Sequence, residues 1–175
     1  MTKMTMTLLA AALMLLPMPR TLSQHGANQS FGFNAASIKG FPTGEAFLTG
    51  GGAYDPNGES PFLKAGGGFR CLADIGQLPL RGCNAGEGIR WDAVELLSSV
   101  PFKCTGALGE PLKTAMTDGN TVVLIADFYR QGDGVDESFT ARMFVSAIDE
   151  APDLPGVQNV WIQGVGCGDA IANFN

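Results

Sequence analysis

The segments TVVLIADFYR at residues 121–130 and SFTARMFVSAID at residues 138–149 decide the fold. In the second segment apolar side chains occupy alternate positions, which is typical of a strand with one buried face. The first segment is apolar on both faces at residues 122–126, so we expect it in the middle of a sheet. QGDGVDE between them has the length and the glycines of a hairpin loop. The sequence therefore predicts an antiparallel pair with one apolar face formed by Phe139, Ala141, Met143 and Val145.

Similar short segments recur along the chain between clusters of Gly, Pro, Asn and Asp, and none sustains helical periodicity over three turns. The pattern predicts an all-β fold, either a single-domain antiparallel β-barrel or a strongly curved β-sandwich of about eight strands. The segment WDAVELL at 91–97 could instead form one or two helical turns. The expected strands are 30–38, 44–54, 63–72, 94–105, 121–129, 138–148, 157–164 and 170–175.

Two glycine triplets, at 50–52 and 66–68, fall in consecutive expected strands. Glycine weakens a strand interior but is tolerated where a sheet bends, bulges or admits another group closely. If these strands pair as a hairpin, the triplets lie opposite each other and form a strongly curved strip. Curvature is the preferred interpretation, and a binding groove with a glycine floor is the functional alternative.

The amino-terminal segment 1–23 has the features of a secretory signal peptide. Lys3 precedes an apolar run at 6–16 that ends at Pro17, and this run is shorter than the roughly 20 residues that cross a bilayer. Cleavage is expected after Ser23 or after Ala27. The sequence thus predicts a signal at 1–23 and one all-β domain at 24–175, secreted or periplasmic, with no membrane association after signal removal.

The charge and the histidine content exclude several classes of function. The chain has 11 basic and 17 acidic residues, a net charge of −6, which becomes −8 when Lys3 and Arg20 leave with the signal. Without a cluster of Lys or Arg, nucleic acid is not an expected partner. The one histidine, His25, stands at the expected cleavage point, so the domain lacks an imidazole for a catalytic triad or a catalytic zinc. Carboxylates remain as the groups that a small hydrolase could use.

The four cysteines suit an exported protein, because oxidising compartments favour disulfides. No C-x-x-C spacing supports a zinc site. The favoured pairing joins Cys71 to Cys83 and Cys104 to Cys167. A Cys71 to Cys104 bridge is the open alternative, since the two lie in the similar segments GFRC and PFKC.

The densest acidic group is Asp133, Asp136 and Glu137 in GDGVDES, with Asp127 on the preceding strand. Calcium takes six to eight oxygen ligands, and an acidic glycine-rich loop can supply several. These residues form the candidate calcium site, although the segment does not match the EF-hand loop. A solvated acidic hairpin is the competing interpretation, and we expect no other cofactor.

Four aromatic residues are the candidate ligand-binding groups: Trp91, Trp161, Tyr54 and Tyr129. Exposed on a β surface, such rings could stack on sugars. Buried, they would be core residues, which is the commoner situation and the one favoured for Trp161.

Several segments together resemble a group of uncharacterised exported bacterial small β-proteins. They are FGFNAASIKGFPTG, the two GGG strands, WDAVELL, ADFYRQGDGVDESFTARMFV and GVQNVWIQGVGCG. The resemblance spans nearly all of the expected mature domain. It implies secretion and a compact β fold, and it assigns no activity to any residue.

The leading functional hypothesis is an exported, disulfide-stabilised, non-catalytic β module with a structural, adhesive or ligand-binding role. Carbohydrate or other cell-surface material is the first partner to test, because tryptophan, acidic and amide side chains on a β surface suit sugars. The alternatives are a small carboxylate-dependent hydrolase and a barrel that binds a small apolar ligand.

We expect mass spectrometry of the exported protein to show a chain that starts at Gln24 or Asn28 and lacks four thiol hydrogens. Four free thiols in native protein would contradict the disulfides, and an intact amino terminus would contradict the signal.

Overall fold

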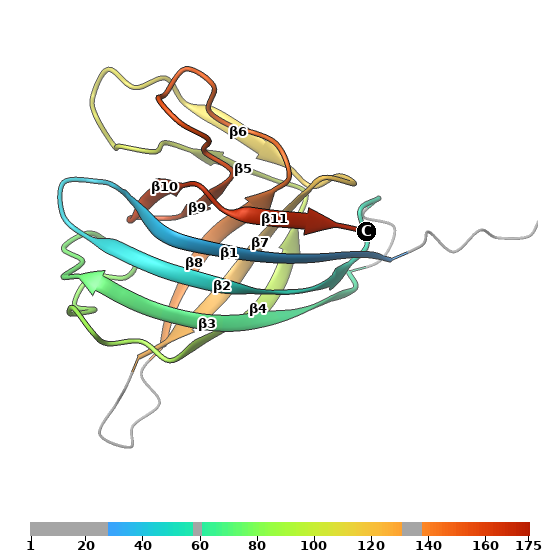
Figure 1. Cartoon of the computed structure of the whole chain (residues 1–175), viewed down its shortest axis with the longest axis horizontal. Helices are drawn as coiled ribbons and strands as arrows, with labels where there is room; N and C mark the ends of the chain where they lie inside the picture. Colours follow the sequence, from blue (N-terminus) through green and yellow to red (C-terminus); the bar gives the residue numbers. More distant parts are fainter. Residues whose placement is uncertain (1–27, 58–60, 131–137) are drawn as a thin grey trace, which may run out of the picture.

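The computed structural model describes residues 28–57, 61–130 and 138–175, and none of these residues is helical. The described chain forms β-strands joined by turns and loops (Figure 1). The strands are β1 Gln29–Gly40, β2 Glu45–Tyr54, β3 Leu63–Ala73, β4 Arg90–Leu97, β5 Ser99–Phe102, β6 Lys113–Met116, β7 Thr121–Tyr129, β8 Ser138–Ser146, β9 Val160–Ile162, β10 Gly166–Gly168 and β11 Ile171–Phe174.

A closed antiparallel barrel is the main body of the protein. The sheet order is β10-β9-β8-β7-β4-β3-β2-β1-β11, and β10 also pairs with β1, so the first eight strands of that order form a ring. β10 pairs with β1 at Ile38–Gly40, and β11 continues along the same side of β1 at Phe31–Asn34. The all-β prediction is confirmed, and the fold is a barrel with one added strand.

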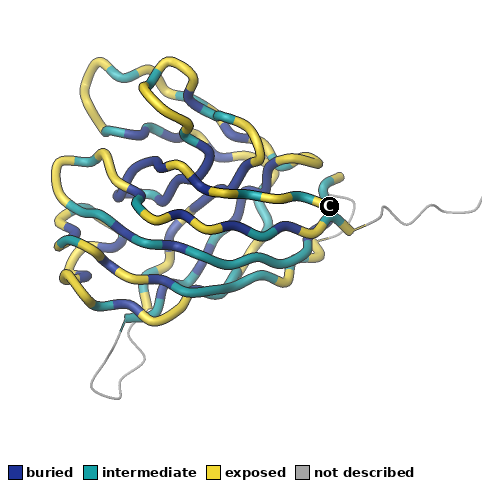
Figure 2. Tube along the Cα trace, viewed as in Figure 1, coloured by how far each residue is buried: buried dark blue, intermediate teal, exposed yellow. Residues whose placement is uncertain are grey.

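The strand pair that decides the fold is present as expected. β7 and β8 pair from Thr121 with Ser146 to Tyr129 with Ser138, and β4 flanks β7 on its other side. The alternate apolar residues of β8 face the barrel core, as the pattern predicts. Figure 2 shows comparable alternation of buried and exposed positions along β1.

The outer face of β7, β8 and β9 is also buried at Val123, Phe144 and Trp161, which explains why the start of β7 is apolar on both faces. The β5–β6 hairpin lies over this face and forms a second apolar cluster with it (Figure 1). From the barrel come Val123, Phe144 and Trp161, and from the hairpin Val100, Phe102 and Ala115. Phe102 and Phe144 meet edge to face with their ring centres 4.8 Å apart.

The two glycine triplets lie opposite each other on β2 and β3, as the hairpin hypothesis requires. Gly50 pairs with Gly67, and Gly51 with Gly66. A Cβ on Gly67 would lie 2.5 Å from the Cα of Gly50, and a Cβ on Gly50 would lie 2.9 Å from Cζ2 of Trp91. No residue with a side chain allows so close an approach, so the triplets make the tight curvature of the barrel wall possible.

Each disulfide joins a loop to the barrel, and both pairings are the ones that the sequence favoured. Cys71–Cys83 spans 6.2 Å between Cα atoms and holds the 74–88 loop, whose Ile75 and Leu80 are buried in the barrel core. Cys104–Cys167 spans 4.8 Å and fastens the end of the β5 segment to β10, the strand that closes the ring. Two disulfides are consistent with an oxidising, extracellular or periplasmic environment.

The prediction of a single strand at 94–105 is wrong. The chain leaves the barrel at Ser98, so β4 belongs to the barrel and β5 to the hairpin. β4 contains WDAVELL, which excludes helical turns there. β6 and β10 were missed because each is very short, and β10 consists of GCG with almost no side-chain pattern.

The predicted signal at 1–23 lies outside the described residues, and the division into a signal and a domain at 24–175 stays a prediction. Within the described ranges, the chain has no helix long and apolar enough to cross a membrane.

We expect Gly67→Ala to lower the free energy of unfolding by about 1–3 kcal/mol, because the added methyl overlaps the backbone of β2. Gly109→Ala is the matched control, since nothing lies within 4 Å of a Cβ at that position. Urea unfolding of the two variants and the parent protein measures the difference. Equal stability of all three proteins would show that the wall tolerates a side chain at Gly67.

Candidate functional site

The structure buries two of the candidate ligand-binding aromatics inside the barrel. Trp91 is fully buried, and its Nε1 donates a hydrogen bond to the Thr49 carbonyl at 3.0 Å. The Tyr54 hydroxyl donates to the Asp118 carbonyl at 2.6 Å. Burial, and to a lesser extent the negative charge of Asp118, raises the pKa of Tyr54. Both polar ends are therefore already satisfied within the fold.

Trp161 is buried in the outer cluster. Its ring is stacked beside Phe144 with centres 6.0 Å apart, and its Nε1 donates to the Lys103 carbonyl at 2.9 Å. Protein atoms cover the rings of Trp91, Trp161 and Tyr54 and complete their hydrogen bonds, so the three side chains occupy core positions, as favoured for Trp161.

Tyr129 is the exception among the four, because it is half-buried on the outer face of β7. The Arg90 guanidinium lies 4.6 Å from the centre of its ring, and Arg90 also pairs with Asp92 at 3.1 Å. One face of the ring is consequently occupied. A ligand-binding role for Tyr129 stays a prediction.

The candidate calcium residues Asp133, Asp136 and Glu137 lie outside the described residues, so calcium binding also stays a prediction. Asp127 lies on β7 and accepts a hydrogen bond from Thr140 at 2.7 Å. In the described ranges, no three His, Cys, Asp or Glu side chains come together in a way that could hold a metal ion.

Several other carboxylates stabilise turns. Asp118 accepts hydrogen bonds from the N–H groups of Asn120 and Thr121 at 2.7 and 2.9 Å. Asp149 accepts from those of Ala151 and Gln158, both at 3.0 Å. These acids satisfy backbone donors next to strand ends, which is a structural role.

Glu110 is the most enclosed of these acids, with its side chain only 4% exposed. It accepts hydrogen bonds from the N–H groups of Cys104, Thr105 and Gly106 at 2.6, 2.8 and 3.0 Å, and from the Thr105 hydroxyl at 2.7 Å. Burial opposes ionisation, but the Thr105 and Cys104 donors, together with Lys113, hold the pKa of Glu110 below its usual value. The ionised carboxylate orders the loop beside the Cys104–Cys167 disulfide.

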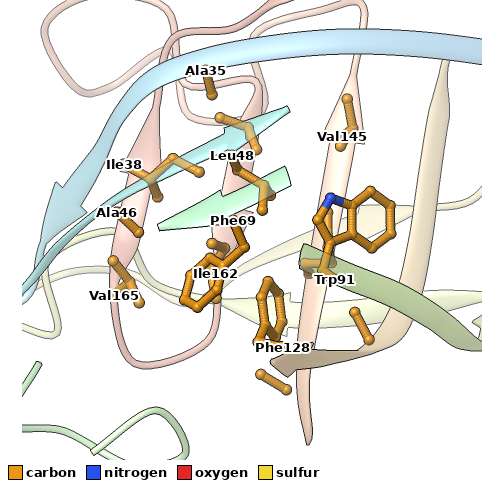
Figure 3. Close-up of a cluster of buried hydrophobic side chains, with 14 of the residues drawn as sticks. Ala35, Ile38, Ala46, Leu48, Phe69, Trp91, Phe128, Val145, Ile162 and Val165 are labelled. Carbon is orange, nitrogen blue, oxygen red and sulfur yellow. The ribbon is translucent and has the colours of Figure 1, made fainter. Parts of the chain in front are cut away.

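The barrel interior is filled by large side chains, as expected for a ring of eight strands. Figure 3 shows Trp91, Phe69, Phe128 and Leu48 converging there. Each of these four is at most 2% exposed. The described interior therefore favours a packed core over a chamber for a small apolar ligand.

A groove on the outside of the barrel is the candidate binding site. It has a volume of about 610 Å³, within the roughly 300–1,000 Å³ typical of small-molecule sites. Its lining comes from β1, β2, β3 and the segment just before β4. The lining residues are Ala36, Phe47, Gly68, Phe69, Arg70, Leu72, Gly88 and Ile89.

One wall of the groove results from a β-bulge in β1. Ala35 pairs with Leu48 and Ile38 with Ala46, so Ala36 and Ser37 together oppose the single residue Phe47. The bulge bends β1 beside the half-buried ring of Phe47. Phe47 makes no ring-to-ring contact with the other described aromatics, unlike the core rings.

The opposite wall is the disulfide-anchored loop. Its end runs beside β3, where Cys71 N–H donates to the Glu87 carbonyl at 2.7 Å and Phe69 N–H to the Ile89 carbonyl at 3.3 Å. Gly88 has a φ of +110°, and a Cβ there would lie 2.8 Å from the Cα of Arg70. Gly88 thus lets the loop lie against β3 and leaves Ile89 57% exposed at the rim.

The floor and the charged side chain of the groove come from β3. Gly68 presents no side chain to the outer face, and Leu72 is 42% exposed. Arg70 is exposed and is the cross-strand partner of Phe47. The arrangement offers an aromatic ring, two aliphatic groups and one guanidinium.

Sequence reasoning missed Phe47, Arg70 and Ile89. Alternation in β2 and β3 places the first two on the outer face, and that signal was available. The glycine-floored groove that was only an alternative interpretation coincides at Gly68 with the observed one.

No family model matches this chain, and the comparisons with curated proteins and with solved structures also find no match.

We expect Glu110→Gln to lower the free energy of unfolding by about 1–3 kcal/mol at neutral pH, because an amide nitrogen would face backbone donors. The Glu110 pKa is lowered by folding, so its contribution is present above the unfolded-state pKa of about 4.3 and is lost as the pH falls through the folded-state value. The difference between parent and variant should therefore shrink on acidification.

Denaturant unfolding at a series of pH values measures this, with the exposed Glu95→Gln as control. A difference that does not change with pH would rule out the ionised carboxylate as its source.

Proposed function

We propose that this protein is an exported, non-catalytic β module that binds carbohydrate in the groove on the outer face of β1, β2 and β3. The observation that carries the proposal is the half-buried Phe47 ring in a groove that also contains Gly68, next to an exposed arginine. Sugar rings pair an apolar C–H face with hydroxyl groups. A ring beside a hydrogen-bond donor suits both features.

The rest of the fold supports a binding role on the outside of the barrel. The interior is packed, and the β5–β6 hairpin covers Val123, Phe144 and Trp161 on the outer face of β7 to β9. The Cys71–Cys83 bridge holds the loop that forms one groove wall. A site on such a held framework needs little ordering when a ligand binds, which favours affinity.

Binding is preferred over hydrolysis because of how the described carboxylates are used. Asp118, Asp149 and Glu110 satisfy backbone donors, and Asp127 and Asp92 pair with neighbouring side chains. None of the described residues that line the groove carries a carboxylate. Glycoside hydrolysis needs two carboxyl groups facing the same bond.

The test is a glycan array probed with the disulfide-bonded protein and with Phe47→Ala. We expect the parent protein to bind, and loss of the ring to weaken binding about tenfold, equivalent to about 1.4 kcal/mol. The control is Ile171→Ala, which removes an apolar side chain that is 78% exposed on β11, outside the groove.

Binding by the parent and by Ile171→Ala, with loss in Phe47→Ala, supports the proposal. Absence of binding by the parent would overturn the carbohydrate function. Equal weakening in both variants would overturn the location.

A further inference from the structure

We infer that the groove selects acidic sugars, with the Arg70 guanidinium pairing with a carboxylate of the ligand. This inference rests on the proposed carbohydrate function and narrows its ligand class. Arg70 is the one charged residue among the described residues that line the groove. A preference of this groove for charged over neutral ligands would therefore depend on Arg70.

Arg70 differs from the neighbouring arginines in having no partner among the described residues. Arg90 pairs with Asp92 and lies over the Tyr129 ring. Arg130 donates to the Gly82 carbonyl at 3.0 Å. The donors of Arg70 remain available, and an arginine fork matches the two oxygens of a carboxylate.

Arg70 lies close enough to Phe47 for one sugar unit to contact both side chains. Arg70 and Phe47 are cross-strand partners on β3 and β2, so their Cβ atoms lie about 4.5–5.5 Å apart. The guanidinium does not cover the Phe47 ring, since the cation–π contacts of the described residues involve Tyr129 and Phe139 instead. A uronic acid can place its ring on Phe47 and its carboxylate against Arg70.

The net charge of the protein is negative, so a preference for an acidic sugar has to come from groups close to the ligand. The chain carries a net charge of −6, so its surface as a whole does not attract polyanions. Charges farther away than the Debye length of about 8 Å at physiological salt contribute little to binding. Selection for an acidic sugar therefore depends on Arg70, and we expect it to weaken at high salt.

The experiment compares a galacturonic acid oligomer with a neutral galactose oligomer of the same length by titration calorimetry. We expect the parent protein to bind the acidic oligomer about fivefold more tightly, the size of an exposed ion pair. Arg70→Gln should reduce this ratio to about one, because it weakens binding of the acidic oligomer more than binding of the neutral one. Arg81→Gln, an exposed residue outside the groove with the same change in charge, should keep the ratio.

If the parent protein binds both oligomers with equal affinity, the preference for acidic sugars is wrong and the carbohydrate function still stands. A parent that binds no glycan on the array would overturn both. A ratio that survives in Arg70→Gln would also overturn the inference. Tighter binding of a sulfated oligomer than of the galacturonic acid oligomer, lost in Arg70→Gln, would overturn the carboxylate as the preferred group.

Discussion

The barrel depends on one contact, the packing of the Trp91 indole against the glycine triplets of β2 and β3. Trp91 on β4 pairs with Gly67 on β3, and its ring reaches Gly50 and the Thr49 carbonyl on β2. The contact therefore links three consecutive strands of the wall from the inside. Because Gly50 and Gly67 lack Cβ atoms, the wall can bend tightly and the largest side chain of the core can fill the space beneath it.

Closure of the barrel divides the remaining apolar residues into two clusters. The inner faces of the strands fill the core, while Val123, Phe144 and Trp161 face outward and need another cover. The β5–β6 hairpin supplies it, and the Cys104–Cys167 bridge and the buried Glu110 hold the adjoining loop in place. The hairpin thus removes one side of the barrel from solvent and leaves the outer face of β1 to β3 exposed.

The groove is assembled from features that each have a structural reason of their own. The bulge in β1 shifts the register beside Phe47, and Gly88 brings the disulfide-anchored loop against β3. Gly68 belongs to the strip that lets the wall curve. Their combination leaves a ring, two aliphatic side chains and a guanidinium facing one groove. The proposed binding site is therefore linked to the curvature of the barrel itself.

The all-β class, the β7–β8 pair, the opposed glycine triplets and the favoured disulfides follow from the sequence alone, because alternation, turn residues and cysteine spacing are local signals. The short strands β6 and β10 do not, because three or four residues carry too little pattern. The sequence favoured burial for Trp161 but gave no preference for Trp91, and it could not say that one ring lies inside the barrel and the other in the outer cluster. Only the tertiary structure decided this, through the register of β4 and β9 and the cover provided by the hairpin. The same holds for the groove, whose residues Ala36, Phe47, Arg70 and Ile89 are brought together by pairing between strands, a non-local interaction that no single segment encodes.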